Sequence, residues 1–158
     1  MAISELDKID RRILQTLQTT GNLSNLELAE KVGLSPTPCA RRVKRLEADG
    51  FIRGYVALVD QDKLGLTLTA HVSVTMDRHT PERFQTFETE VQSYPEVLEC
   101  CVVTGQSADY LLKVVVSDMA HYEQFLLGKL TRIAGVSGVH SSFQLRNVMA
   151  KTALPLAL

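Results

Sequence analysis

Apolar positions in the first fifty residues recur at steps of three and four, which predicts short amphipathic helices punctuated by glycines. The first predicted helix ends at Gly21. The second begins at Ser24, because Ser24 and Glu27 have the spacing of a capping box, and it ends at Gly33. The apolar face of the first helix comprises Leu6, Ile9, Ile13, Leu14 and Leu17, and that of the second comprises Leu26, Ala29 and Val32.

A third helix is predicted from an N-cap at Ser35 to a stop at Gly50. Pro36 and Pro38 fall in its first turn, where a missing N–H breaks no intrahelical hydrogen bond. Cys39 is expected to pack as a small apolar side chain. The core-facing positions are Ala40, Val43 and Leu46, while the other sides carry Thr37, Arg41, Arg42, Lys44 and Arg45, so the outward surface is basic.

Two short helices joined by a glycine-containing turn are typical of a helix-turn-helix DNA reader. Short side chains at the start of the third helix let its N-terminus approach base edges, and arginines form bidentate hydrogen bonds with guanine or phosphate. The alternative is a solvated basic face on an ordinary helical bundle. The combination of turn, caps and charges favours DNA binding, by Ser24, Asn25, Ser35, Thr37, Pro38, Arg41, Arg42, Lys44 and Arg45.

The pattern changes after this helical region. Apolar and other residues alternate over residues 51–58 around Gly54, a pattern that fits either a short wing or a first strand. The segment from Asp60 to Gly65 is a plausible hinge. The predicted organisation is a helix-turn-helix domain over 1–58, a linker over 59–66 and a second domain over 67–158.

The second domain alternates strands with helices. Thr80 with Pro81 and then Asp118 are helix-start signals, and Gly105 to Asp109 is a tight hairpin connection. The order strand, helix, strand, strand, helix, strand is that of a ferredoxin-like α+β fold. Strands are predicted at Leu68–Met76, Val97–Thr104, Tyr110–Val116 and Val139–Arg146, with helices ending at Tyr94-Pro95 and at Gly135.

The strand at Tyr110–Val116 is apolar on both alternating faces, whereas the two helices of this fold cover only one face of the sheet. The simplest way to bury the open face is to pack it against the same sheet of a second copy of the chain, because a two-fold interface is self-complementary. Such a dimer also presents two helix-turn-helix units to a pseudo-palindromic DNA site.

Composition restricts the functional classes. The 158 residues are 45% hydrophobic and 22% charged with a net charge of -1, which is ordinary globular composition, and no apolar run approaches the roughly 20 residues of a membrane span. The three cysteines have no zinc-ligand spacing, and the four histidines share no ligand spacing. We therefore expect a cytoplasmic protein that is neither a metalloprotein nor an enzyme.

Several motifs, in order, resemble one family. The residues are Leu6-Asp7, Ile9 to Leu14, Leu28-Ala29, Val32 to Ser35, Arg41 to Glu47, Gly50 to Ile52, Val103 to Gly105, Asp109 to Leu112 and the tail Lys151 to Leu156. Together they resemble the Lrp/AsnC (feast/famine) transcriptional regulators over essentially the whole chain. The resemblance implies DNA-bound homodimers that assemble into homo-octamers, with amino-acid effectors bound in the C-terminal domain.

The resemblance also implies that the hairpin from Thr104 to Leu111 is part of the effector site. Backbone N–H groups around Gly105 can hold an α-carboxylate, and Asp109 can pair with an α-ammonium; taken alone, both are also ordinary turn residues. The segment Ser137–Ser142 resembles the part that a neighbouring subunit contributes. The implied effector-binding residues are Val103, Thr104, Gly105, Gln106, Ser107, Asp109, Tyr110, Leu111, Met119 and Ser141.

No charged residue is evident to pair with a charged effector side chain, so leucine or methionine is the expected effector, without any cofactor. One alternative remains, an amino-acid sensor or interaction module whose helical domain binds a protein partner. Salt dependence discriminates the two, because DNA affinity falls steeply with salt.

Overall fold

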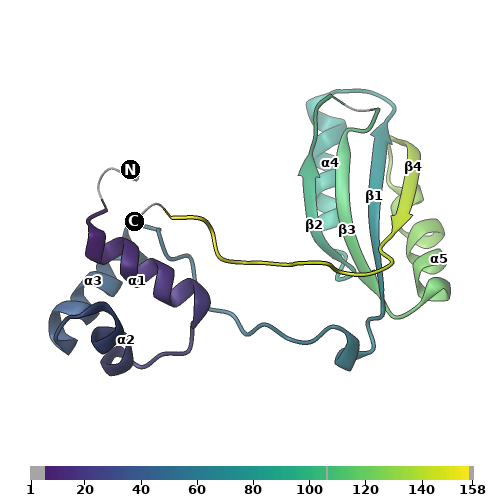
Figure 1. Ribbon diagram of the computed structural model, residues 1–158. Coiled ribbons are helices and arrows are strands. Elements are labelled where there is room, and N and C mark those ends of the chain that lie inside the picture. The colour runs from purple at the N-terminus through teal and green to yellow at the C-terminus, as the bar shows by residue number, and fades with distance from the viewer. Residues whose placement is uncertain (1–5, 106, 157–158) are drawn as a thin grey trace. The chain divides into compact units, whose positions relative to one another are not determined.

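The computed structural model describes residues 6–105 and 107–156, which form two compact units (Figure 1). The first unit joins residues 6–58 to residues 148–156, and the second contains residues 59–147. The chain therefore leaves the first unit and returns to it. The sequence placed residues 148–158 in the C-terminal domain, whereas the structure groups residues 148–156 of this tail with the helices.

The first unit is a trihelical bundle whose helices α2 and α3 begin after Ser24 and Ser35, as predicted. Ser24 and Glu27 form the expected capping box, and Gly33 ends the second helix in the left-handed conformation. Asp7 and Asp10 form another capping box on the first helix. Cys39 is fully buried, as predicted. The helices are α1 (Lys8–Thr19), α2 (Asn25–Val32) and α3 (Pro36–Ala48).

The C-terminal tail packs on this bundle. The side chain of Gln18 donates to the carbonyl of Leu154 (3.2 Å) and accepts from its N–H (2.6 Å), and Leu156 packs against the helical core. These contacts explain why the tail belongs to the first unit.

Residues 51–59 form neither a helix nor a strand. The segment is extended and exposes Tyr55, Val56 and Leu58, and no strand of the described chain pairs with it. It is followed by the 3-10 turn η2 (Asp62–Leu64).

The second unit has the predicted ferredoxin-like order, with one antiparallel sheet arranged β2-β3-β1-β4. Both long helices lie on the same face of the sheet (Figure 1). The last strand begins and ends three residues earlier than predicted, because its pairing runs from Met76 opposite Val136 to Ala70 opposite Phe143. The elements are β1 (Leu68–Met76), α4 (Pro81–Gln92), β2 (Val97–Val102), β3 (Tyr110–Val116), α5 (Met119–Gly128), η3 (Leu130–Arg132) and β4 (Val136–Phe143).

The core lies between the helices and the sheet, around Val72, Phe87, Leu112 and Phe125. On the opposite, open face Leu111 is 39% exposed. Part of this face is covered from within the chain, since Gln61 donates to the hydroxyl of Thr69 (3.1 Å) and Val115 is buried. A smaller part of the open face is therefore left uncovered than the sequence suggested.

Candidate functional site

The first candidate site is the outer face of α3. Asn25, at the start of α2, donates through its side chain to the carbonyl of Pro36 (2.9 Å) and so ties together the N-termini of the two helix-turn-helix helices. Thr37, Arg41 and Lys44 are exposed beside it. A shallow hollow on this face is lined by Asn25, Pro36, Thr37, Ala40, Arg41 and Lys44.

The N-terminus of α3 is open to a ligand. Ser35 occupies the N-cap position, yet its side chain makes no capping hydrogen bond. Pro36 follows in the first turn and has no N–H that requires a partner. The hydroxyl of Ser35 is therefore not used in a cap, and the positive end of the helix dipole faces outward. Ser24 differs, because its hydroxyl is engaged with the Glu27 carboxylate (2.6 Å) in the capping box.

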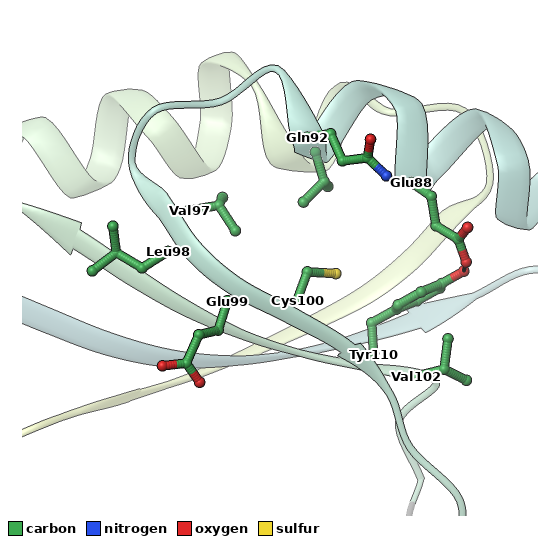
Figure 2. Close-up of a pocket in the computed structure, with 9 residues that line it drawn as sticks. Glu88, Gln92, Val97, Leu98, Glu99, Cys100, Val102 and Tyr110 are labelled. Atoms are coloured by element: carbon green, nitrogen blue, oxygen red, sulfur yellow. Dashed lines mark hydrogen bonds between the residues drawn. The ribbon is translucent and has the colours of Figure 1, made fainter. Parts of the chain in front are cut away.

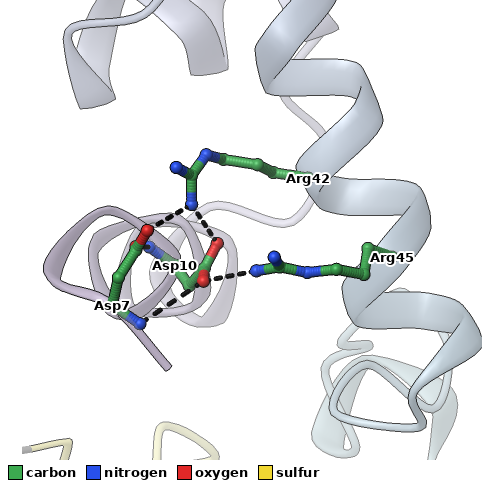
Figure 3. A network of polar contacts seen from close by, with 4 residues as sticks. All are labelled: Asp7, Asp10, Arg42 and Arg45. Atoms are coloured by element: carbon green, nitrogen blue, oxygen red, sulfur yellow. Dashed lines mark hydrogen bonds and ion pairs between the residues drawn. The ribbon is translucent and has the colours of Figure 1, made fainter. Parts of the chain in front are cut away.

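Two of the predicted DNA-binding arginines form ion pairs with α1 (Figure 3), although the Arg45 side chain stays 50% exposed. The Arg42 guanidinium donates to Asp7 (2.6 Å) and to Asp10 (2.8 Å), and Arg45 donates to the other oxygen of Asp10. The Asp10 side chain is only 1% exposed. These ion pairs join α1 to α3, so Arg42 and Arg45 are engaged in holding the bundle together.

The electrostatics of this cluster agree with its geometry. The N–H of Asp10 and the Arg42 guanidinium hold the pKa of the Asp7 carboxyl below its usual value, against the opposing effect of burial. The hydrogen bonds from Arg42 to Asp7 and Asp10 raise the pKa of that arginine. The sequence signal for this cluster was the three-residue spacing of Asp7 and Asp10, which also marks a helix N-terminus.

The second candidate site is the hairpin that connects β2 to β3. Its base is closed by a hydrogen bond from the N–H of Val103 to the carbonyl of Asp109 (2.9 Å). Gly105 has φ of +82° and open space around it, so the chain turns there with exposed backbone. The hydroxyl of Thr75 donates to the Ser107 carbonyl (3.0 Å), which ties the hairpin to β1. Thr104 is exposed, and the predicted residue Gln106 lies outside the described residues.

The Asp109 carboxylate, expected to face an effector, has partners within the chain. One oxygen accepts the N–H of Met76 (2.7 Å), and the other lies 2.7 Å from Nε2 of His79. The side chain is 16% exposed.

Tyr110 also points away from the hairpin. Its ring lies between those of Phe84 and Phe87, with centroids 5.6 and 4.4 Å away, and its hydroxyl donates to Glu88 (2.8 Å). Burial and the Glu88 carboxylate raise the pKa of its phenol. Tyr110 is thus part of the core, whereas Leu111 next to it lies on the open face and Val103 is half-buried.

Two of the predicted effector residues, Met119 and Ser141, lie away from the hairpin of their own subunit. β3 carries the chain away from the hairpin before α5 begins, which places Met119 roughly 20 Å along the strand direction from it. Ser141 lies opposite Val72 in the sheet, and its hydroxyl is 2.5 Å from that of Tyr122. The structure therefore brings together Val103, Thr104, Gly105, Ser107 and Asp109, but not Met119 or Ser141.

A groove between α4 and the edge strand β2 was not foreseen from the sequence. It has a volume of about 430 Å³, with the side chain of Cys100 at its centre and the Glu88 carboxylate and Tyr110 at one end (Figure 2). Burial raises the pKa of the Cys100 thiol to about 11. Its neighbour Cys101 lies on the other face, where its thiol donates to the carbonyl of Leu111 (3.6 Å).

Residues 6–105 and 107–156 contain neither a metal-binding cluster nor a helix that could span a membrane. Among those residues no group of three or more His, Cys, Asp or Glu side chains has a metal-binding arrangement. No helix in the described part of the chain is both long and apolar enough to cross a bilayer.

Comparison with known proteins matches both units. Residues 69–154 match the Lrp/AsnC ligand binding domain, and residues 6–53 match a winged helix-turn-helix DNA-binding family. The Bkd operon transcriptional regulator of Pseudomonas aeruginosa is 45% identical over 98% of this chain and 100% of its own length. The leucine-responsive regulatory protein of Escherichia coli is 44% identical over 95% of this chain and 91% of its own.

A solved structure is similar over the same extent. A transcriptional regulator from Neisseria meningitidis in complex with L-methionine has 42% identity and a TM-score of 0.91, and the match covers 95% of this chain and 96% of that one. The similarity therefore includes both units.

Proposed function

Because the chain belongs to the Lrp/AsnC family and is a DNA-binding transcriptional regulator with an amino-acid-binding domain, we propose that an apolar amino acid, leucine or methionine, controls its binding to DNA. The observation that carries this proposal is the hairpin around Gly105, which exposes backbone, while among its described residues no free charged side chain faces outward.

The outer face of α3 is proposed to read DNA. Arg41 and Lys44 are exposed and make no ion pair with any described residue, so they are available to phosphate or to base edges. Thr37 and Ser35, at the helix N-terminus, are short enough to let the helix enter a major groove. Arg42 and Arg45 support this face by holding α3 against α1.

The hairpin is proposed to hold the effector. Backbone N–H groups near Gly105 suit an α-carboxylate, while Val103 and Leu111 offer apolar contact to a side chain. Two relatives support an apolar effector, since one is a leucine-responsive protein and the other is a structure with L-methionine. Ser141 and the segment around it are proposed to act only from a neighbouring subunit.

Assembly completes the proposal. The open sheet face, with Leu111 exposed, is proposed to pack on a second copy, and such dimers are proposed to form homo-octamers. The effector then shifts DNA affinity by favouring one arrangement of the helix-turn-helix units. We propose that this regulator acts in the cytoplasm without a cofactor and without catalysis, and with residues 59–66 as the linker between its domains.

Calorimetry of the protein against all twenty amino acids tests the effector. We expect leucine or methionine to bind more tightly than any charged amino acid. Tighter binding of lysine or aspartate would refute an apolar effector, and no binding of any amino acid would refute amino-acid control.

A matched pair of variants tests the location. Gly105→Ala and Gly65→Ala each add a Cβ at a positive φ in open space, so the two substitutions cause similar local strain. Gly105→Ala is expected to weaken effector binding by roughly fivefold or more because it alters the hairpin backbone, and Gly65→Ala to change it by less than about twofold. Equal effects would place the effector elsewhere.

A further inference from the structure

Asp109 stands where the hairpin meets the end of β1. Its N–H donates to the carbonyl of Val74 (2.8 Å), and its side chain accepts the N–H of Met76 (2.7 Å). Between Thr75 and Met76 the pairing of β1 with β4 shifts register. Asp109 therefore provides, through both backbone and side chain, the partners that β1 needs at its irregular end.

A second set of contacts links the same carboxylate to α4. Nε2 of His79 lies 2.7 Å from the second oxygen of Asp109, and the His79 ring lies 5.9 Å from that of Phe84. Phe84 in turn meets the Tyr110 ring edge-on at 5.6 Å. Both residues at the start of β3, Asp109 and Tyr110, are thus held by the N-terminal half of α4 and the loop before it.

We infer that Asp109 is a positioning residue for the effector hairpin and not the partner of the effector's α-ammonium group. Each carboxylate oxygen already has a close partner, and the side chain is largely buried. Its role is to hold the backbone of Thr104, Gly105 and Ser107 in one arrangement, so that the N–H groups are aligned before a ligand arrives. His79 shares that role. The inference rests on the proposed effector site at the hairpin.

Substitution at position 109 separates the two roles. Asp109→Asn keeps an oxygen that can accept the Met76 N–H but removes the charge, whereas Asp109→Ala removes both. A positioning role predicts that Asp109→Asn binds L-leucine or L-methionine within about threefold of the unmodified protein, and that Asp109→Ala loses roughly tenfold or more. His79→Ala, which removes one of the two contacts, is expected to fall between them. Equal loss in the Asn and Ala variants would overturn the inference.

A ligand without its amino group gives an independent test. If Asp109 paired with the ammonium, des-amino leucine would bind the unmodified protein and Asp109→Ala equally, because the interaction is already absent from that ligand. A positioning role predicts that Asp109→Ala weakens the binding of des-amino leucine by the same factor as it weakens the binding of leucine. Equal binding of des-amino leucine to the two proteins would overturn the inference.

Amide hydrogen exchange tests the same role without any effector. Asp109→Ala is expected to accelerate exchange of the Met76 amide and of the hairpin amides by tenfold or more, whereas Asp109→Asn should leave them nearly protected. Unchanged protection of Met76 in Asp109→Ala would overturn the inference. If no amino acid binds any of these proteins, the proposed effector fails, while the exchange pattern still decides whether Asp109 positions the hairpin.

Discussion

Arg42 donates from α3 to the Asp10 carboxylate over 2.8 Å, and Asp10 is almost completely buried between the two helices (Figure 3). An arginine in a basic helical run is thereby directed into the domain instead of toward solvent. Within the run, Arg41 and Lys44 are exposed and form no ion pair with a described residue, whereas Arg42 and the half-exposed Arg45 form ion pairs with α1. This division leads to separable effects on DNA affinity and on stability.

Arg41→Ala is expected to weaken binding to a specific DNA site by about 1–3 kcal/mol and to reduce the slope of log affinity against log salt by about 1. The reason is the loss of an exposed guanidinium from the outer face of α3. Fluorescence anisotropy over a range of salt concentrations measures both quantities. Arg12→Ala, an exposed arginine on α1, is the control and should leave the slope unchanged. An Arg41→Ala protein with the original slope would contradict the assignment.

Arg42→Ala is expected to lower the free energy of unfolding of the first unit by about 1–3 kcal/mol, because the buried Asp10 carboxylate loses a charged hydrogen-bond donor. Arg41→Ala should change it by less than about 0.5 kcal/mol. Urea unfolding followed by circular dichroism measures the difference. If the two variants were equally stable, the ion pairs between α1 and α3 would contribute nothing.

Local rules predicted the helix starts well, because a cap depends on residues that are three positions apart. Ser24 with Glu27, Thr80 and Asp118 all cap as expected. The fold class followed from the order of the elements. The ends of β4 were displaced because pairing with β1, sixty or more residues earlier in the chain, decides which residues join the sheet.

The roles of individual site residues were harder to predict, for the same physical reason. Whether Arg42 meets DNA or Asp10 depends on a contact across 32 residues, and the partner of the Asp109 carboxylate lies 33 residues away at Met76. Residue type and spacing identified both side chains as candidates. Only the packing of separate elements shows which partner each side chain has.

The Asp7 carboxyl makes the stability of the first unit depend on pH in the acid range. Its pKa lies below the ordinary value of 3.8 in the folded protein, chiefly through the N–H of Asp10 and then through Arg42. Its contribution is therefore fully present above pH 3.8 and is lost as the pH falls through the lowered folded-state value. Asp7→Asn keeps a good N-cap and removes only the charge.

Comparing urea midpoints at pH 6 and pH 3 checks this expectation. The unmodified protein should lose more stability between the two pH values than Asp7→Asn does. The difference should be small because the Asp7 side chain is 51% exposed. An Asp7→Asn protein with the larger loss would reverse the assigned direction.

Cys100 is expected to react slowly despite its position in a surface groove (Figure 2). A pKa of about 11, set mainly by burial, compares with an ordinary value of 9.0, so about a hundredfold less thiolate is present at pH 8. The greater intrinsic nucleophilicity of a high-pKa thiolate offsets part of this, which leaves a reaction with iodoacetamide roughly tenfold slower than that of an ordinary thiol.

A Cys39→Ala, Cys101→Ser variant isolates this thiol, and the same variant unfolded in guanidinium is the control. The rate for the folded protein should rise about tenfold per pH unit up to about pH 10, because only the thiolate reacts. A rate that begins to level off near pH 9 would show that Cys100 has the pKa of an ordinary thiol. A slow rate would argue against a redox pair of Cys100 and Cys101, because a thiol with a raised pKa forms little thiolate and the two side chains lie on opposite faces of β2.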